Sequence, residues 1–502
     1  MTALGAAHAG LSHSGLPDAV LADIAALEPE RGLYVGGRSV AAGPTFDVTD
    51  PATGQLLARV PDAGAADATA AVDAAAAAFP GWAATAPRQR SEALRRTFEL
   101  MLEENESLAA LISAENGKSL ADARAEVTYA AEFFRWFAEE AVRPDGGYAE
   151  SPAGGTRTIV TTRPVGVAAL VTPWNFPAAM ATRKIGPALA AGCTVVLKPA
   201  AETPLTAIAL ARLMDRAGVP AGVVNVVPTT DAATVVTAWL EDARVRKLSF
   251  TGSTGVGRRL LAQAADRVVN SSMELGGNAP FVVAADADVD AAVQGALIAK
   301  FRNGGQACTA ANRFYVHASV ADRFVEGFGA AIESLRVGSA FSDGTTIGPL
   351  ISAKAVAGVT ELVADALARG ARVSHQAPAP ELDGHFYPPT LLVDVPSDAS
   401  VVREEVFGPV APVVTWTDEA DLLAQVNDSE LGLAAYVYSR DLKWALQLAE
   451  RIDAGMVGVN RGVVSDPAAP FGGVKQSGIG REGAGEGVRA FRETQYFSVD
   501  WS

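Results

Sequence analysis

TVVLKPAAETPLTAIALARLMDRAGVPAGVVNVV, residues 194–227, contains a strand pattern, a helix pattern and a second strand pattern in succession. The runs TVVLK and VVNVV are short, apolar and rich in valine, as buried strands are, and apolar residues recur at helical spacing between 204 and 217. A helix that joins two strands in this way forms a crossover, so the two strands run parallel. The segment therefore predicts an α/β fold built on a parallel sheet.

The same alternation continues on both sides of this segment. Residues 65–143 have a helical pattern, and so do 177–191, 231–241, 255–266 and the region near 288–302. Further strand patterns are KLSFT at 247–251, FVVA at 281–284, TLLVDV, APVVTW and MVGVN. A chain of 502 residues is too long for one hydrophobic core, so we expect two or three domains.

The last eight residues, QYFSVDWS, are β-like and rich in aromatic side chains. An unpaired edge strand tends to pair with another chain. We therefore expect this tail to join the sheet of a neighbouring subunit.

Composition excludes several classes of partner. The formal net charge is −16, with no block of Lys or Arg, which argues against nucleic acid and anionic membranes. The N-terminus has no Lys or Arg before Arg31, unlike signal and transit peptides, and the uncharged run from Pro164 to Thr182 is broken by prolines. Two cysteines are too few for a disulfide framework. We expect a cytoplasmic protein and, because the five histidines lack ligand spacing, no metal.

Cys308 follows a Gly-Gly pair in FRNGGQACTAANR, residues 301–313. A free cysteine is commonly a small buried hydrophobe, but its thiolate is also a strong nucleophile. The residues around Cys308 leave both interpretations open, whereas Cys193, within ALAAGCTVVL, suits the buried one.

Two features favour a nucleotide. In FTGSTGVGR, residues 250–258, Gly252, Gly255 and Gly257 lie where a strand ends and a helix begins, and a helix N-terminus offers free N–H groups to pyrophosphate. The spacing is not the usual dinucleotide fingerprint, so an ordinary turn is the alternative. Lys198 ends the strand TVVLK, where open α/β sheets bind ligands, unless it only extends to solvent.

Two polar residues are candidates for acid–base chemistry and oxyanion binding. Glu274, in SMELGGN, lies between apolar residues that would raise its pKa toward that of a general base, unless it belongs to an edge strand and faces water. Asn175, in VTPWNFP, either caps a helix or donates an amide N–H to an oxyanion. Along that helix Phe176, Met180 and Arg183 share one face, which would be either a tunnel wall or an ordinary core stripe.

Seven motifs, in order along the chain, resemble the aldehyde dehydrogenases: TPWNFP, KPAAETP, FTGST, MELGGNAP, GGQACTAANR, EEVFGPV and PFGGVKQSGIGRE. The resemblance implies the α/β aldehyde dehydrogenase fold. It implies a Rossmann-like cofactor domain (1–145 and 163–276), an α/β catalytic domain (277–480) and a small β oligomerisation element (146–162 and 486–502). It also implies a homodimer or homotetramer.

The resemblance assigns roles to the candidate residues. It makes Cys308 the nucleophile and Glu274 the general base, and Asn175 with the backbone N–H of Cys308 would form the oxyanion hole. Lys198 would hold the adenosine ribose, Glu405 the nicotinamide ribose and Ser253 the pyrophosphate. The remaining cofactor contacts that it implies are Trp174, Thr251, Gly252, Gly257, Gly276 and Phe407.

Longer stretches, such as NFPAAMATRKIGPALAAGCTVVLKPA and KFRNGGQ, resemble the succinate-semialdehyde dehydrogenase subgroup. That subgroup holds the substrate carboxylate with two arginines and a serine, which implies Arg183, Arg302 and Ser465, beside Phe176 and Met180. A guanidinium binds a carboxylate bidentately. The alternatives are a solvated helix face for Arg183 and a salt bridge at a helix end for Arg302.

Three departures from the family pattern carry expectations of their own. Ala310 stands where the subgroup often has a second cysteine, which excludes a disulfide switch within this loop. Arg461 adds a third cation near the tunnel mouth, suited to a longer or dianionic substrate. Ala201 stands where NAD-preferring relatives often have Glu, which favours NADP over NAD.

These residues together predict NAD(P)-dependent oxidation of succinate semialdehyde to succinate, through a thiohemiacetal and a thioester on Cys308. The alternatives are glutarate semialdehyde or another short aldehyde as substrate. A cysteine hydrolase or acyltransferase would use the same nucleophile, but it would have no use for Lys198 or the FTGST turn.

Overall fold

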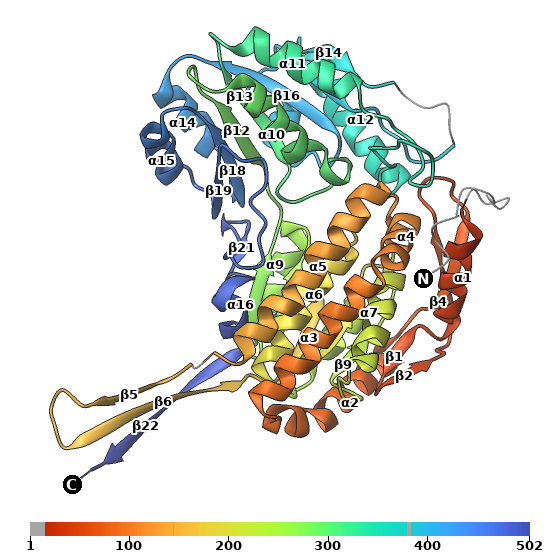
Figure 1. Ribbon diagram of the computed structural model, residues 1–502, viewed down its shortest axis with the longest axis vertical. Helices are drawn as coiled ribbons and strands as arrows, with labels where there is room; N and C mark the ends of the chain where they lie inside the picture. The colour runs from red at the N-terminus through yellow and green to blue at the C-terminus, as the bar shows by residue number, and fades with distance from the viewer. Residues whose placement is uncertain (1–15, 144, 379–382, 502) are drawn as a thin grey trace.

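The computed structural model describes residues 16–143, 145–378 and 383–501. The N-terminal stretch that bears on targeting, with His8 and His13, lies outside these residues. Two large sheets, each covered by helices on both faces, lie one above the other in Figure 1, and a narrow arm leaves the lower one. The predicted α/β class is confirmed.

The lower sheet has eight strands, and its five central strands run parallel. In spatial order it consists of β2 (Arg38–Val40), β1 (Leu33–Val35), β9 (Val224–Val226), β8 (Thr194–Lys198), β7 (Val167–Val171), β10 (Val245–Thr251), β11 (Asn270–Glu274) and β21 (Gly478–Ile479). The segment 194–227 supplies β8, a helix and β9, which pair in parallel as predicted.

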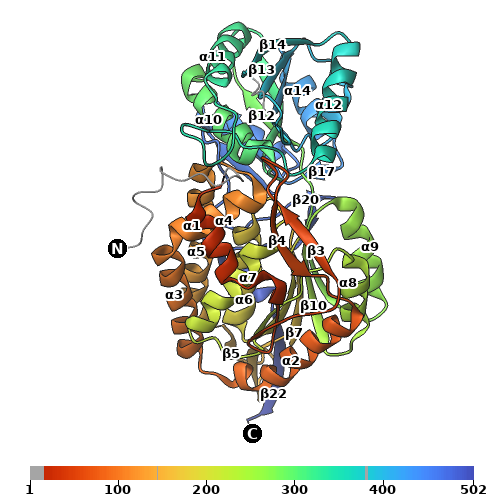
Figure 2. The same ribbon diagram turned by 90° about the vertical axis from the view of Figure 1, so that its right-hand side faces the viewer.

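Helices cover both faces of this sheet because alternate residues of its strands are apolar and buried. Ala168 and Leu170 of β7 face one core, and Val167, Ala169 and Val171 face the other. Figure 2 shows α6 and α7 on one side of β7 and β10, with α8 and α9 on the other. The helices of this half are α1 (Asp18–Ala26), α2 (Ala65–Ala84), α3 (Pro87–Glu103), α4 (Asn105–Asn116), α5 (Leu120–Ala141), α6 (Pro177–Ala191), α7 (Pro204–Arg216), α8 (Ala232–Glu241) and α9 (Thr254–Ala265), with the short 3-10 turn Pro29–Arg31.

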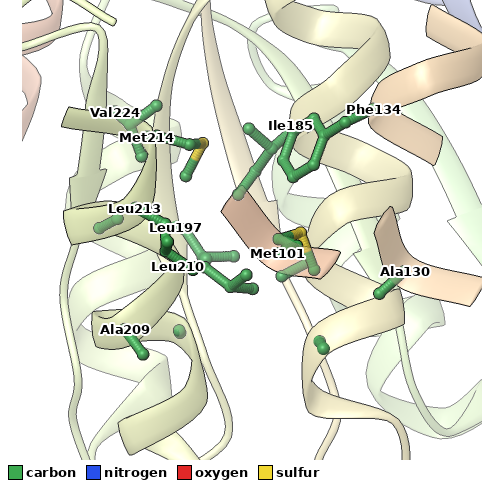
Figure 3. Close-up of a cluster of buried hydrophobic side chains, with 14 of the residues drawn as sticks. Met101, Ala130, Phe134, Ile185, Leu197, Ala209, Leu210, Leu213, Met214 and Val224 are labelled. Carbon is green, nitrogen blue, oxygen red and sulfur yellow. The ribbon is translucent and has the colours of Figure 1, made fainter. Parts of the chain in front are cut away.

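Figure 3 shows part of the first of these cores, in which Leu197 of β8 lies between helices α6 and α7. Met101, Phe134, Ile185 and Leu210 surround it and are almost fully buried. Burial of each such side chain contributes roughly 1.5–3 kcal/mol. This core fixes the position of α5 and α6, which carry several residues of the site described below.

The upper sheet has seven strands, parallel except for β14. Its strands, in order, are β14 (Arg372–Gln376), β15 (Thr390–Val393), β16 (Val410–Trp416), β13 (Ala311–His317), β12 (Ala279–Val283), β18 (Ala434–Tyr438) and β19 (Met456–Val459). Its helices are α10 (Val289–Phe301), α11 (Ala321–Glu333), α12 (Ala353–Ala368), α13 (Ser400–Arg403), α14 (Glu419–Asn427) and α15 (Leu442–Arg451).

The arm is a three-stranded antiparallel sheet that projects from the body (Figure 1). Its strands are β5 (Gly147–Glu150), β6 (Thr156–Pro164) and β22 (Arg492–Asp500), which follows α16 (Ala484–Arg489). Two small ribbons complete the fold: β3 (Thr45–Thr49) with β4 (Leu56–Pro61), and β17 (Leu431–Gly432) with β20 (Val474–Lys475). The predicted strand at the C-terminus is confirmed, but the expectation that it is unpaired within its own chain is wrong, because it pairs with β6 over its whole length. That it also joins the sheet of a neighbouring subunit stays a prediction.

The helix predicted over 177–191 and the strand over 194–198 have the predicted bounds. The helices predicted over 204–217 and 231–241 differ by one residue at one end, and the helix predicted over 255–266 begins and ends one residue earlier. The helical pattern over 65–143 forms four separate helices, α2 to α5. Across the described ranges, no helix is both long enough and apolar enough to cross a bilayer. The domain limits given above stay a prediction.

Candidate active site

Cys308 lies just after a tight turn at the end of α10. The turn is a short 3-10 segment, η3 (Arg302–Gly305), in which Asn303, Gly304 and Gly305 all have φ between 55° and 77°. Non-glycine residues rarely adopt this conformation, and a Cβ at Gly305 would clash with the carbonyl oxygen of Gly408. The Gly-Gly pair is therefore required for the turn that presents Cys308.

The two cysteines have different environments. Cys308 is partly exposed, whereas Cys193 is fully buried with its Sγ 3.3 Å from the carbonyl oxygen of Phe491. Burial raises the pKa of the Cys308 thiol to about 12, although the positive charge of Arg183 lowers it. Burial also raises the pKa of Cys193, to about 11. The structure thus presents one thiol, in its protonated form, at an accessible position.

Asn175 connects the end of β7 to the loop that carries Cys308. Its Nδ2 donates to the carbonyl oxygen of Gln306 at 3.2 Å, two residues before the nucleophile candidate. An amide nitrogen has two N–H groups, so one remains for another acceptor. The alternative role as a helix cap is wrong, because the first N–H groups of α6, those of Ala178 and Ala179, donate to Glu126 instead.

Glu274 ends β11 and is only 3% exposed. The alternative of an edge-strand carboxylate in water is wrong, since β21 pairs on the outer side of β11. Burial raises the pKa of Glu274 well above its usual value, and the nearby Glu482 raises it further. Among the described residues the Oε2 atom of Glu274 has no hydrogen-bond partner. A raised pKa makes the ionised carboxylate a stronger base, which suits Glu274 to take a proton from water.

Glu482, which the sequence analysis missed, lies at the centre of a buried charge cluster. Its carboxylate lies 2.7 Å from Nε of Arg183 and 2.5 Å from Nζ of Lys184. Burial raises the pKa of Glu482, but Lys184 and Arg183 lower it more, so the net pKa lies below the usual value. Glu482 is therefore ionised, and its negative charge adds to the effect of burial on the pKa of Glu274. No local signal in the sequence pairs residues 183 and 482, because the fold alone brings them together.

The two candidate arginines for the substrate carboxylate differ in their contacts. Arg183 is only 1% exposed, so a solvated helix face is wrong for it, and its guanidinium lies 4.0 Å from the ring centroid of Phe471. Arg302 is partly exposed, lies 5.2 Å from the ring centroid of Phe176, and has no ion-pair partner among the residues described. A salt bridge at a helix end is therefore wrong for Arg302, although its charge opposes the rise that burial causes in the pKa of the nearby Asp122.

The rest of this pocket comes from α5, α6 and the loop after β19. Phe176 and Met180 are buried, and Met180 Sδ lies 2.9 Å from a guanidinium nitrogen of Arg183. Ser465 is partly exposed and lies close to the Tyr129 hydroxyl. Burial raises the pKa of Tyr129, and Arg183 and Arg302 lower it, so the two arginines and Ser465 surround this tyrosine. Sequence reasoning missed Tyr129, which is one of several aromatic residues on α5.

The predicted cofactor residues converge at the carboxyl ends of β8, β10 and β11. The N-cap of α9, Ser253, makes no side-chain cap hydrogen bond, which leaves the first N–H groups of the helix for an anion. Gly257 packs against Leu275, and the adjacent Thr251 Oγ1 is buried without a partner among the described residues. Gly252 closes the same turn, its N–H donating to the carbonyl oxygen of Glu274. These groups fit the pyrophosphate of a dinucleotide.

Two further positions flank this cradle. Lys198 is 8% exposed, so the alternative that its side chain only extends to solvent is wrong. Burial lowers the pKa of Lys198, and the negative charge of Glu202 opposes that change. Burial raises the pKa of Glu405 to about 7, although the N–H of Gly277 donates to it, and Gly276 lies beside the same carboxylate. Trp174 and Phe407 meet edge to face, with ring centroids 5.4 Å apart.

Within the described ranges no group of three or more His, Cys, Asp and Glu side chains could hold a metal ion.

Comparison with known proteins assigns this chain to a protein family. The model of the aldehyde dehydrogenase family matches residues 39–497, nearly the whole chain, and the chain therefore belongs to this family. The predicted fold and the prediction of an NAD(P)-dependent enzyme are confirmed.

Three relatives within the family are named for particular semialdehyde substrates. The succinate-semialdehyde dehydrogenase (NADP+) GabD of Escherichia coli is 52% identical over 91% of this chain and 95% of its own. The glutarate-semialdehyde dehydrogenase of Pseudomonas putida is 49% identical over 93% of this chain and 97% of its own. The crystal structure of succinate-semialdehyde dehydrogenase from Burkholderia pseudomallei covers 93% of this chain and 97% of its own, with 48% identity and a TM-score of 0.92.

Proposed function

We propose that the protein oxidises succinate semialdehyde to succinate with NADP or NAD. The observation that carries the proposal is the partly exposed cation Arg302, which lies in the turn that presents Cys308 and near enough to lower the pKa of that thiol. A substrate with an aldehyde at one end and a carboxylate a few carbons away places its two ends at Cys308 and Arg302. Arg183, Ser465 and Tyr129 complete the surroundings of the carboxylate.

Each step uses a group of the chain in a stated role. The ionised Glu274 takes the proton of the Cys308 thiol and releases it to water. The Cys308 sulfur then adds to the aldehyde carbon, and the oxyanion of the resulting thiohemiacetal accepts N–H groups from Asn175 and the Cys308 backbone. The bound nicotinamide supplies a hydride acceptor, which leaves a thioester on Cys308. Glu274 then takes a proton from the water that attacks the thioester, and succinate and the free thiol result.

For the cofactor we favour NADP. Ala201 leaves no carboxylate at that position to compete with a 2′-phosphate, although the carboxylate of Glu202, the next residue, opposes the effect of burial on the pKa of Lys198. The relative from Escherichia coli is named for NADP. Glutarate semialdehyde, one methylene longer, is the second candidate substrate, since the relative from Pseudomonas putida bears that name and the exposed Arg461 adds a cation.

The decisive experiment measures cofactor reduction with succinate semialdehyde, glutarate semialdehyde and butanal. Arg302→Ala removes a charge-assisted contact of about 1.5–3 kcal/mol, so KM for succinate semialdehyde should rise roughly tenfold to a hundredfold. KM for butanal, which has no carboxylate, should change little. Arg323→Ala, at an exposed arginine of α11, serves as the charge-matched control. An equal rise for both aldehydes would refute the proposed carboxylate site.

We also propose that the protein is a cytoplasmic homo-oligomer. Both cysteines are free, which suits a reducing compartment. The arm exposes Tyr148, Tyr496, Phe497 and Trp501, and large exposed apolar side chains that cluster in this way are typical of an interface.

A further inference from the structure

A buried ion pair behind the site joins Lys118 to Glu126. The side chains of both are 0% exposed, and Lys118 Nζ lies 2.6 Å from Glu126 Oε2. Lys118 directly follows Gly117, which ends α4, and Glu126 lies on α5. Two buried charges are stable only when they are paired and hydrogen-bonded, so the remaining contacts of this pair show what it holds in place.

Lys118 holds the backbone of Asn175. Its Nζ donates to the Asn175 carbonyl oxygen at 2.7 Å, and Asn303 Nδ2 donates to the same oxygen at 2.7 Å. Both lone pairs of this carbonyl are thereby used. Because the backbone of Asn175 is fixed from two directions, the starting point of its side chain is fixed as well.

Glu126 binds the first turn of α6, which follows Asn175 in the chain. Its Oε1 accepts the N–H groups of Ala178 and Ala179 at 2.9 and 3.2 Å. The single ion pair therefore ties residue 175 and the first turn of α6 to α5. A carboxylate at a helix N-terminus is also favoured by the helix dipole.

The ring of Phe176 contacts Lys118 and also borders the proposed substrate pocket. The Phe176 ring centroid lies 4.1 Å from Lys118 Nζ and 5.2 Å from the Arg302 guanidinium. Lys118 thus contacts the residue that follows Asn175 as well as the carbonyl of Asn175 itself.

We propose that Lys118 is a positioning residue that aims the Asn175 amide at the oxygen of the reacting aldehyde. The proposal rests on the proposed oxyanion role of Asn175. Lys118 does not touch the substrate; it acts through the backbone of residue 175. Misplacement of a reacting group by about 1 Å costs up to roughly a hundredfold in rate.

A double-mutant cycle on the full-length enzyme tests this. Lys118→Met keeps the length of the side chain and should lower kcat with succinate semialdehyde about tenfold to a hundredfold, with KM for the cofactor unchanged. Asn175→Ala should lower kcat as well. If Lys118 acts through Asn175, adding Lys118→Met to Asn175→Ala should cause little further loss, since residues that act as a unit are not additive.

A second variant and a control separate positioning from general stability. Lys118→Met/Glu126→Gln removes both charges, so no unpaired buried carboxylate remains to unfold the protein, and it should show the same non-additivity. Lys247→Met removes another buried lysine, whose Nζ donates to Asn270 and Ser272. The effect of Lys247→Met on kcat should be equal with and without Asn175→Ala.

The outcomes distinguish this inference from the proposed function. Equal losses from Lys118→Met with and without Asn175→Ala would overturn the positioning role alone. Unchanged kcat in Asn175→Ala itself would overturn the proposed oxyanion hole, and the inference with it. A kcat of Lys118→Met equal to that of the unmodified enzyme would also refute the inference.

Discussion

Cys308 and Cys193 differ mainly in their exposure to solvent. Cys193 is enclosed by the helices of the lower half, while Cys308 lies partly exposed beyond a left-handed turn. Both thiols have raised pKa values because of burial. A protonated resting thiol requires a base before it can attack, and the buried Glu274 has an elevated pKa in the same pocket.

The raised pKa of Cys308 predicts how its alkylation depends on pH. Below a pKa of about 12 the thiolate fraction rises about tenfold per pH unit. The rate of alkylation by iodoacetamide in the cofactor-free enzyme should therefore increase from pH 7 to pH 10 without a plateau. The Cys193→Ala variant isolates the signal from Cys308, and mass spectrometry identifies the alkylated residue. A plateau near neutral pH would show a thiolate already formed at rest.

Short motifs predict the residues whose role is local, but not those whose role depends on distant partners. Cys308, Glu274 and Asn175 each lie in a recognisable motif. Glu482 becomes significant only through Arg183 and Lys184, some 300 residues earlier in the chain. A charged residue in a sequence is by default a surface residue. Glu482 ends the motif PFGGVKQSGIGRE, but the motif alone does not show that this carboxylate is buried against Arg183 and Lys184.

At the scale of elements, the N-terminus of α9 carries the proposed pyrophosphate site and depends on close packing. A Cβ at Gly257 would lie 2.5 Å from Cδ2 of Leu275, whereas a Cβ at Gly255, two residues earlier on the same helix, would meet nothing within 4 Å. Alanine favours a helix over glycine by about 1 kcal/mol at either position. The two positions therefore differ in packing and hardly at all in propensity.

Gly257→Ala should push α9 away from Leu275 and weaken cofactor binding, by about tenfold in Kd if the displacement costs roughly 1.4 kcal/mol. Gly255→Ala should leave Kd within about twofold and raise the thermal stability slightly. Fluorescence titration with NADP and NAD measures both variants. Equal affinities for the two variants would contradict the packing argument.

The elements themselves were largely predictable because their patterns are periodic. The helix 177–191 and the strand 194–198 follow from apolar spacing, Pro177 and Gly192 alone. The two-residue strands β20 and β21 were not predictable, because such short pairings have no periodicity and form only where β17 and β11 offer free edges. The order of strands in the sheets likewise depends on contacts between distant segments.

At the scale of the whole molecule, the arm has no core of its own, because no residue of its three strands is fully buried. Tyr496 and Phe497 are neighbours on β22 and are 58% and 42% exposed. Successive residues of a strand point to opposite faces, so both faces of the arm carry an exposed aromatic ring. A small sheet with two wet faces is marginally stable alone, which favours a second subunit as its cover.

The variant Tyr496→Asp/Phe497→Asp should therefore dissociate the proposed oligomer. Burial of each ring contributes about 1.5–3 kcal/mol, so the loss of both should raise the dissociation constant at least about a hundredfold. Sedimentation velocity measures the change across a dilution series. Leu442→Asp, at an equally exposed apolar residue of α15, is the matched control and should sediment like the unmodified protein. Because none of the proposed site residues lies on β5, β6 or β22, an unmodified protein that sediments as a monomer would refute the interface and leave the proposed chemistry untouched.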